Sequence, residues 1–183
     1  MKRMFAAFAA TVMTVAAASA QQPDLMVGGA PMSPKSTIVE NASKASNLTT
    51  LVTAVKAAGL VDTLSGPGPF TVFAPPNEAF DKLPAGTVDT LLKPESKDEL
   101  TKVLTYHVVP GKLDAKTLIK KVKAGHGTAE LTTVEGEKLT AMMSADGKGL
   151  QLKDAKGNIA NVSTADVYQS NGIVHVIDAV LLP

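Results

Sequence analysis

Residues 66–76 read Gly-Pro-Gly-Pro-Phe-Thr-Val-Phe-Ala-Pro-Pro, and this stretch decides how the chain can fold. From Phe70 to Ala74 the side chains are mostly aromatic or β-branched, which favours a strand. The glycines and prolines on either side interrupt regular structure, because glycine is conformationally free and proline donates no backbone hydrogen bond. We therefore predict a short strand at 70–74, bounded sharply at both ends.

A second apolar run lies near the other end of the chain, from Ile173 to Leu182. Its residues are apolar at nearly every position rather than at alternate positions. A strand with this pattern is covered on both faces. We expect it to lie deep in a sheet.

Two helices are expected before the first strand. Thr37 and Glu40 have the spacing of a capping box, so a short helix should begin there and end near Ser46. A second helix should end at Gly59, which can adopt a positive φ angle. Its apolar residues recur with helical spacing, at positions 48, 51, 52 and 55.

Two more helices are expected after the first strand. Asn77 should cap a short helix that continues to Leu83. Ser96 and Glu99 repeat the capping-box spacing, so a further helix should begin there. It should lead into a strand-like run at 106–109.

The second half of the chain favours strands. One more helix is expected, from Asp114 to Val122. Short strands separated by glycine-containing turns are expected at 130–134, 138–143, 150–153, 159–162 and 165–168. Because helices gather in the first half and strands in the second, the predicted fold class is α+β.

Residues 1–20 have the pattern of a signal peptide. Lys2 and Arg3 precede an uncharged apolar stretch that ends in Ala-Ser-Ala, and no later stretch is apolar for long enough to span a bilayer. We expect a secreted protein, extracellular or periplasmic. Residues 21–35 contain glycines and prolines without periodicity, so we expect a flexible N-terminal segment there, followed by one domain at 36–183.

The composition excludes several kinds of site. Cysteine is absent, so no disulfide, thiolate nucleophile or cysteine-ligated metal can form. The net charge is only +1, and Arg3 is the only arginine, so nucleic acid is not an expected partner. Lys116, Lys120 and Lys123 are interpreted as a solvated helix face, with a weak interaction with acidic polysaccharide or lipid headgroups as the alternative.

No catalytic or metal-binding pattern is recognisable. Residues 168–172 (Tyr-Gln-Ser-Asn-Gly) lack the first glycine of a nucleophile elbow around Ser170. His107, His126 and His175 are far apart and have no metal-ligand spacing. His107 and His175 lie in apolar runs, which indicates neutral imidazoles hydrogen-bonded in the core. We expect no enzyme activity, no cofactor and no metal.

Three stretches together resemble the motifs of the fasciclin domain family, and the resemblance covers essentially all of Ser36 to Pro183. The first stretch is 68–80, the second is 104–111 and the third is 171–181. They contain the residues that carry the resemblance, which are Phe70, Thr71, Val72, Phe73, Ala74 and Pro75 in the first, Tyr106 and His107 in the second, and His175 and Asp178 in the third.

The resemblance is to single-domain, secreted bacterial members and implies a wedge of two β-sheets with helices packed along one side. It implies a role in adhesion rather than catalysis, with the tyrosine–histidine pair and the later histidine supporting the fold. Asp166 and Val167 stand where animal members have an Asp-Ile recognition element. The candidate interaction surface implied by the resemblance consists of Tyr106, His107, Asp166, Val167 and Tyr168, with the loop from Asp166 to Asn171.

The sequence therefore predicts a non-enzymatic module that mediates adhesion or contact with a matrix or surface. Its expected partner is a protein or polysaccharide on a cell surface or matrix. The alternative is an envelope carrier that binds a small aromatic or lipid-like ligand in a cleft between helices and sheet. The sequence predicts neither the oligomeric state nor the identity of the partner.

Overall fold

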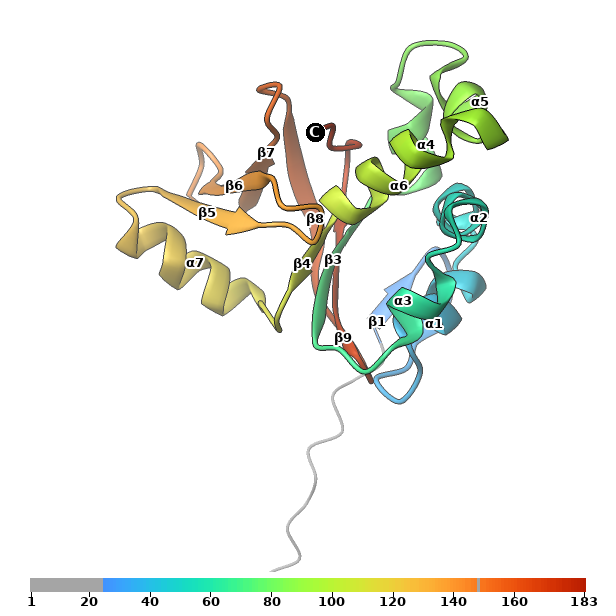
Figure 1. Ribbon diagram of the computed structural model, residues 1–183. Coiled ribbons are helices and arrows are strands. Elements are labelled where there is room, and N and C mark those ends of the chain that lie inside the picture. The colour runs from blue at the N-terminus through green and yellow to red at the C-terminus, as the bar shows by residue number, and fades with distance from the viewer. Residues whose placement is uncertain (1–24, 148) are drawn as a thin grey trace, which may run out of the picture.

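The computed structural model describes residues 25–147 and 149–183, so the predicted signal peptide at 1–20 lies outside the described residues (Figure 1). The centre of the protein is a seven-stranded sheet with the order β4-β3-β9-β8-β7-β6-β5. Its strands are β3 (Phe70–Ala74), β4 (Val108–Pro110), β5 (Thr128–Thr132), β6 (Lys138–Met143), β7 (Leu150–Lys153), β8 (Ile159–Gln169) and β9 (Gly172–Ile177).

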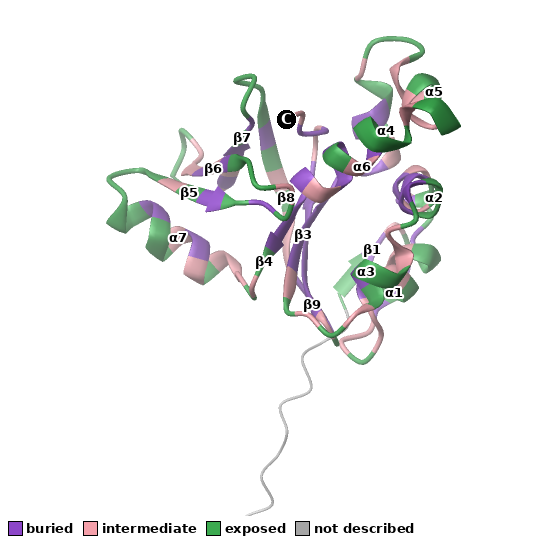
Figure 2. Ribbon diagram, in the orientation of Figure 1, coloured by how far each residue is buried: buried purple, intermediate pink, exposed green. Residues whose placement is uncertain are grey.

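Strands β3 and β9 form the middle of one half of the sheet. They run parallel to each other, and Phe73 is the register partner of His175. Strand β9 is buried at every position from Gly172 to Ile177, as its continuous apolar pattern predicts. Figure 2 shows both strands in the buried colour along most of their length. The predicted strand at 70–74 is confirmed with its bounds unchanged.

The sheet bends at β8, where the antiparallel pairing with β9 has two register shifts between Val162 and Val167. On one side of the bend lie β3, β4 and β9, and on the other lie β5, β6 and β7 (Figure 1). The two edge strands approach each other, since the Val134 N–H donates to the Val108 carbonyl at 2.8 Å. The result is a nearly closed wedge with an α+β fold. The sequence predicts two short strands at 159–162 and 165–168, but the structure forms one bent strand.

Most helices cover the outer face of the β3–β9 half, while α7 (Ala115–Ala124) packs against β5 and β6 (Figure 1). The others are α1 (Ile38–Lys44), α2 (Thr49–Ala58), α3 (Val61–Ser65), α4 (Asn77–Asp81), α5 (Thr87–Leu91) and α6 (Lys97–Tyr106), with a 3₁₀ turn at Pro94–Ser96. One apolar core lies between these helices and the sheet. A second lies inside the wedge and beneath α7, and includes Leu118 and Val122.

Two of the predicted helix-end signals are confirmed. Thr37 and Glu40 form the predicted capping box on α1. Gly59 ends α2 with a φ of 73°. The Asp114 side chain accepts a hydrogen bond from the Thr117 N–H and so caps α7.

Two predicted caps are wrong. The Ser96 side chain makes no capping hydrogen bond to α6. Asn77 does not cap α4; its Oδ1 accepts the Thr50 N–H at 3.0 Å and so caps the neighbouring helix α2. An amide side chain satisfies any unpaired helix N–H within reach, so the tertiary arrangement selects which helix it caps.

The segment at 106–109 is also assigned differently by the structure. Helix α6 continues to Tyr106, and the His107 N–H donates to the Leu104 carbonyl as the helix ends. Strand β4 begins only at Val108. The apolar run is thus split between a helix end and a strand. A short apolar run indicates burial but does not distinguish a helix from a strand, so the sequence could not show where this run divides.

Residues 25–32 correct the expectation of a flexible N-terminal segment at 21–35. Strands β1 (Leu25–Val27) and β2 (Ala30–Met32) pair as a hairpin. Val27, Ala30 and Met32 are buried in the core beneath the helices. Three apolar side chains are too few to give a recognisable period in the sequence. They are enough to hold the hairpin in place when they are buried against the core.

Candidate functional site

His107 lies at the C-terminal end of α6 and is buried. Its Nδ1 lies 2.7 Å from the Val103 carbonyl, and its Nε2 accepts the Leu181 N–H at 3.0 Å. A carbonyl can only accept, so the imidazole is neutral with its proton on Nδ1. Burial lowers the pKa of His107 to about 4. The ring therefore joins α6 to the C-terminal segment and has no free nitrogen for a ligand.

Tyr106 is also enclosed and joins α6 to the far half of the sheet. Its hydroxyl donates to the Lys138 carbonyl and accepts the Ala155 N–H, both at 3.0 Å. Burial raises the pKa of Tyr106. Both hydrogen bonds go to backbone groups, so Tyr106 stabilises the wedge.

His175 connects three segments that are distant in sequence. Its Nδ1 accepts the Asp166 N–H at 3.2 Å, and its Nε2 donates to the Leu113 carbonyl at 2.8 Å. Burial lowers the pKa of His175, in keeping with a neutral ring. Asp166 has a positive φ of 59°, and its Oδ1 accepts the Ala115 N–H at the start of α7 at 2.7 Å.

These positions correct the candidate interaction surface. Tyr106, His107 and Val167 are 0%, 2% and 1% exposed, so their side chains cannot reach a partner in this structure. Asp166 and Tyr168 are partly exposed. Buried groups of this kind are used for packing and internal hydrogen bonds.

A groove does lie beside the exposed part of the predicted loop. We name it the end groove, and it is lined by Pro67, Gly68, Pro69, Lys112, Gln169, Ser170, Asn171 and Gly172. The space that the centre of a water molecule can reach in it is ≈ 360 Å³. The Lys112 ammonium lies 5.2 Å from the centre of the Tyr168 ring at its border. The groove therefore offers a cation and polar groups, and the cation lies against an aromatic ring.

The base of the end groove is held by hydrogen bonds and close backbone contacts. The Asn171 side chain accepts the Ile38 N–H at 3.1 Å and donates to the Leu64 carbonyl at 2.7 Å. A Cβ on Gly68 would lie 2.0 Å from the Asn171 carbonyl oxygen, and one on Gly172 would lie 2.0 Å from the Phe70 carbonyl oxygen. Only glycine permits this approach, so the groove has a rigid base.

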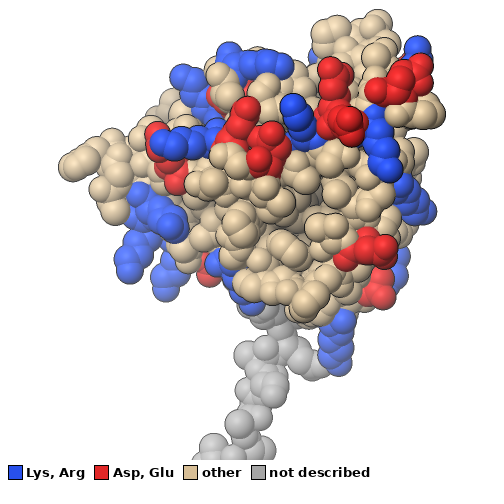
Figure 3. Space-filling view, in the orientation of Figure 1, with Lys and Arg blue, Asp and Glu red and all other residues tan. Residues whose placement is uncertain are grey.

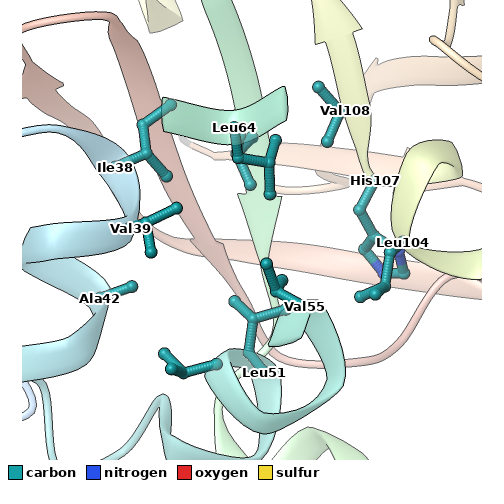
Figure 4. A pocket seen from close by; sticks show the side chains of 11 residues that line it. Ile38, Val39, Ala42, Leu51, Val55, Leu64, Leu104, His107 and Val108 are labelled. Atoms are coloured by element: carbon teal, nitrogen blue, oxygen red, sulfur yellow. The ribbon is translucent and has the colours of Figure 1, made fainter. Parts of the chain in front are cut away.

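A second hollow lies between the helices and the sheet (Figure 4). Helices α1, α2, α3 and α6 and strands β3 and β4 line it, with Ile38, Val39, Ala42, Leu51, Val52, Val55, Leu64, Val72, Leu104, His107 and Val108. We name it the apolar crevice. Its space for water centres is ≈ 30 Å³, about enough for two waters. Both His107 nitrogens are already hydrogen-bonded, so the crevice offers a ligand almost purely apolar contacts.

The sequence missed Lys112, the 67–69 loop and the crevice residues other than His107. Lys112 follows a Pro-Gly turn that has no functional signal of its own. The parallel pairing of β3 and β9 brings the start of each strand to the same edge, and so places the 67–69 loop beside the 169–172 turn. No local pattern reports a contact of this kind.

Two features of the described residues bear on the kind of site. Across residues 25–147 and 149–183, no group of three histidine, aspartate or glutamate side chains is placed to hold a metal ion. Nor does any helix in that part of the chain have the length and hydropathy needed to cross a bilayer.

Comparisons with known proteins agree with the architecture. The fasciclin domain model matches residues 46–183. The chain is 54% identical over 147 residues to Protein sll1483 of Synechocystis sp., covering 80% of this chain and 73% of that protein. It is 36% identical over 159 residues to the cell surface glycolipoprotein MPB83 of Mycobacterium bovis, covering 86% of this chain but only 64% of that protein.

A solved structure has the same fold. A fasciclin domain pair from the insect cell adhesion molecule fasciclin I matches with a TM-score of 0.56 and 24% identity, covering 70% of this chain and 42% of the insect chain. The sequence motifs, the wedge-shaped sheet and the matched family model all agree. This chain belongs to the fasciclin domain family.

Proposed function

We propose that this protein is exported and acts as a non-enzymatic adhesion module that contacts a protein or polysaccharide through the end groove. The observation that carries the proposal is the groove itself. Lys112 and Ser170 are exposed in this groove. The base of the groove is fixed by the side-chain hydrogen bonds of Asn171 and by the close backbone contacts at Gly68 and Gly172. A rigid scaffold that displays loops is the usual architecture of a recognition module.

Three further observations support this proposal. Residues 1–20 have the pattern of an export signal. The relative from Mycobacterium bovis is named as a cell surface glycolipoprotein. The side chains most able to do chemistry, His107 and His175, are occupied by internal hydrogen bonds.

The test is attachment of cells that lack the gene. Wild-type protein should restore attachment, whereas Lys112→Glu combined with Ser170→Arg should not, because this pair reverses a charge and fills the groove. Lys44→Glu combined with Ser43→Arg is the matched control, since both residues are exposed at the end of α1. Normal attachment of the deletion strain to several surfaces would contradict the proposal, as would full restoration by the groove variant.

The apolar crevice favours a second candidate function, the carriage of a slender apolar molecule such as an acyl chain. Apolar cavities without polar partners stay dry and accept apolar ligands. The present opening is narrow, so binding requires α1 and α2 to move apart. Native mass spectrometry of protein purified from its host should then show a bound mass.

A matched pair of variants tests this second function. Ala42 lines the crevice, so Ala42→Phe should fill it and remove the bound mass. Ala57 is exposed on α2, so Ala57→Phe should retain the bound mass. Bare polypeptide in the wild-type spectrum would count against carriage.

A further inference from the structure

Lysines dominate the outer side of α7 and the loop before it. From Gly111 to Gly125 there are five lysines and one acidic residue, a net charge of +4 (five minus one), whereas the whole chain carries +1. All five lysines are exposed. Figure 3 shows basic side chains gathered over α7 at the lower left of this face.

Four of these lysines lie on one side of α7 or in the loop just before it. Lys116, Lys120 and Lys123 lie at i, i+4 and i+7, so they share one side of α7 over a rise of about 10 Å. Lys112 precedes the helix and lines the end groove beside Tyr168. We name Lys112, Lys116, Lys120 and Lys123 the lysine row. Lys112 is the member of the row that lines the end groove, and the other three lie on the helix that follows it.

Two carboxylates near the start of α7 accept backbone hydrogen bonds, and one of them, Asp114, also interacts electrostatically with Lys116 of the row. Asp114 precedes α7 and accepts the Thr117 N–H, and Asp166 on β8 accepts the Ala115 N–H. Within residues 25–147 and 149–183 no row lysine forms a salt bridge, whereas Lys138 pairs with Glu130 at 2.6 Å.

This charge pattern costs the helix stability. Like charges one turn apart, as at Lys116 and Lys120, are destabilising. Helix α7 itself contains no acidic residue to offset them. A local conflict of this kind is typical of a functional surface.

We propose that the lysine row and the end groove together bind an acidic polysaccharide, a linear chain with repeated carboxylate or sulfate groups. This inference rests on the proposed function and names its partner. A linear polyanion can follow the row, so several ammonium groups bind it at once. Lysine ammonium groups act as point charges and suit such a polymer, whereas nucleic-acid grooves rely on arginine forks and stacking side chains.

The structure favours a polysaccharide over a membrane surface. A helix that lies in a bilayer interface inserts its apolar side. In α7 that side is already covered, because Leu118 and Val122 are both 0% exposed. The exposed large hydrophobic side chains of the described chain lie outside α7, at Leu25, Met26, Val134 and Ile159.

The test uses polygalacturonate as the acidic polysaccharide, dextran as the neutral one, and vesicles of phosphatidylcholine with and without phosphatidylglycerol. The mature protein should bind polygalacturonate with an affinity that falls as salt rises, because exposed charges are screened. It should bind dextran and both vesicles at least about tenfold more weakly. Absence of polygalacturonate binding would overturn the proposal, and equal or tighter binding to the anionic vesicles would assign the row to a membrane instead.

Charge-matched triple variants locate the site. Lys116→Gln, Lys120→Gln and Lys123→Gln together should weaken polygalacturonate binding by about tenfold or more, because these contacts supply the salt-dependent affinity. The control combines Lys56→Gln, Lys97→Gln and Lys102→Gln, which are exposed on α2 and α6 and change the net charge equally. It should change binding less than about twofold. Equal losses in the two triples would show only a net-charge effect and overturn the proposal.

The attachment assay separates this inference from the proposed function. If the α7 triple variant restores attachment fully while the groove variant does not, the polysaccharide inference fails and the adhesion proposal stands. If the deletion strain attaches normally but the α7 row still binds polygalacturonate, the adhesion proposal fails and the binding site stands. A triple with arginine at the three α7 positions should retain polygalacturonate binding, because the positive charges are kept. Loss of binding in this arginine triple would show that charge alone does not account for the interaction.

Discussion

Phe73 and His175 are register partners on the parallel strands β3 and β9, and their rings stack with centroids 5.6 Å apart and planes inclined by 23°. Both side chains are fully buried. Through its nitrogens the same imidazole also holds the Asp166 N–H and the Leu113 carbonyl. The His175 ring therefore stacks on Phe73 and forms two hydrogen bonds to backbone groups, so this one side chain connects four segments of the chain.

Replacing His175 with Phe should preserve the stacked ring but remove both hydrogen bonds. The Asp166 N–H and the Leu113 carbonyl would lose their partner, so we expect the free energy of unfolding to fall by about 2–4 kcal/mol. Chemical denaturation at neutral pH measures this change. Phe73→Leu is the comparison, because it weakens stacking and packing without removing either hydrogen bond. If its loss equals or exceeds that of His175→Phe, the hydrogen bonds are not the main contribution.

The protein should lose stability as the pH falls from about 6.5 to about 4. The folded state holds His107 neutral because burial lowers its pKa to about 4, while the unfolded chain takes up the proton near its ordinary pKa. In this window the unfolded state binds more protons, so stability rises with pH and falls on acidification. The loss from this group is on the order of 3 kcal/mol and is complete below the folded pKa.

His107→Gln should flatten this pH dependence, although it also lowers stability at neutral pH. Unfolding free energies at pH 7.5, 6.0, 5.0 and about 4 measure the slope. His126→Asn is the control, because His126 is exposed in a loop at a φ of 58°, which asparagine tolerates. A slope in His107→Gln as steep as in the wild type would show that other groups cause the acid sensitivity.

A chain that begins at Ser33 should be less stable than one that begins at Leu25. Removing the β1–β2 hairpin uncovers the core contacts of Val27 and Met32, each worth about 1.5–3 kcal/mol when fully buried. We expect a loss of about 3–6 kcal/mol in chemical denaturation. Equal stability of the two chains would show that the buried contacts of Val27 and Met32 do not stabilise the domain.

Gly172→Ala should destabilise the protein because the new Cβ would lie 2.0 Å from the Phe70 carbonyl oxygen. Backbone cannot move aside as a side chain can, so we expect a loss of about 1–3 kcal/mol or more. Gly149→Ala is the control, since its nearest atom is the Ser144 hydroxyl at 3.3 Å. Thermal unfolding of both variants measures the difference, and similar midpoints would show that the strands can separate to admit the methyl group.

Much of the local structure can be predicted from the sequence. The strand at 70–74 and the strands at 138–143 and 150–153 have the expected bounds, and the capping box at Thr37 places α1. These features depend on neighbouring residues, since turns, caps and apolar periodicity act over a few positions.

Other features were decided only when distant segments met. The sequence alone specified most of the strands and several of the helices, although not the β1–β2 hairpin, α3 or α5, and the three motifs indicated the family. Tertiary structure decided that Asn77 caps α2, that 25–32 forms a buried hairpin, and that Tyr106 and His107 lie inside. It also placed Lys112 in the end groove. The parallel pairing of β3 with β9 determines that the 67–69 loop and the 169–172 turn lie together there. The physical reason is that burial and hydrogen-bond partners depend on which surfaces pack together, and contacts between distant residues leave no period in the local sequence.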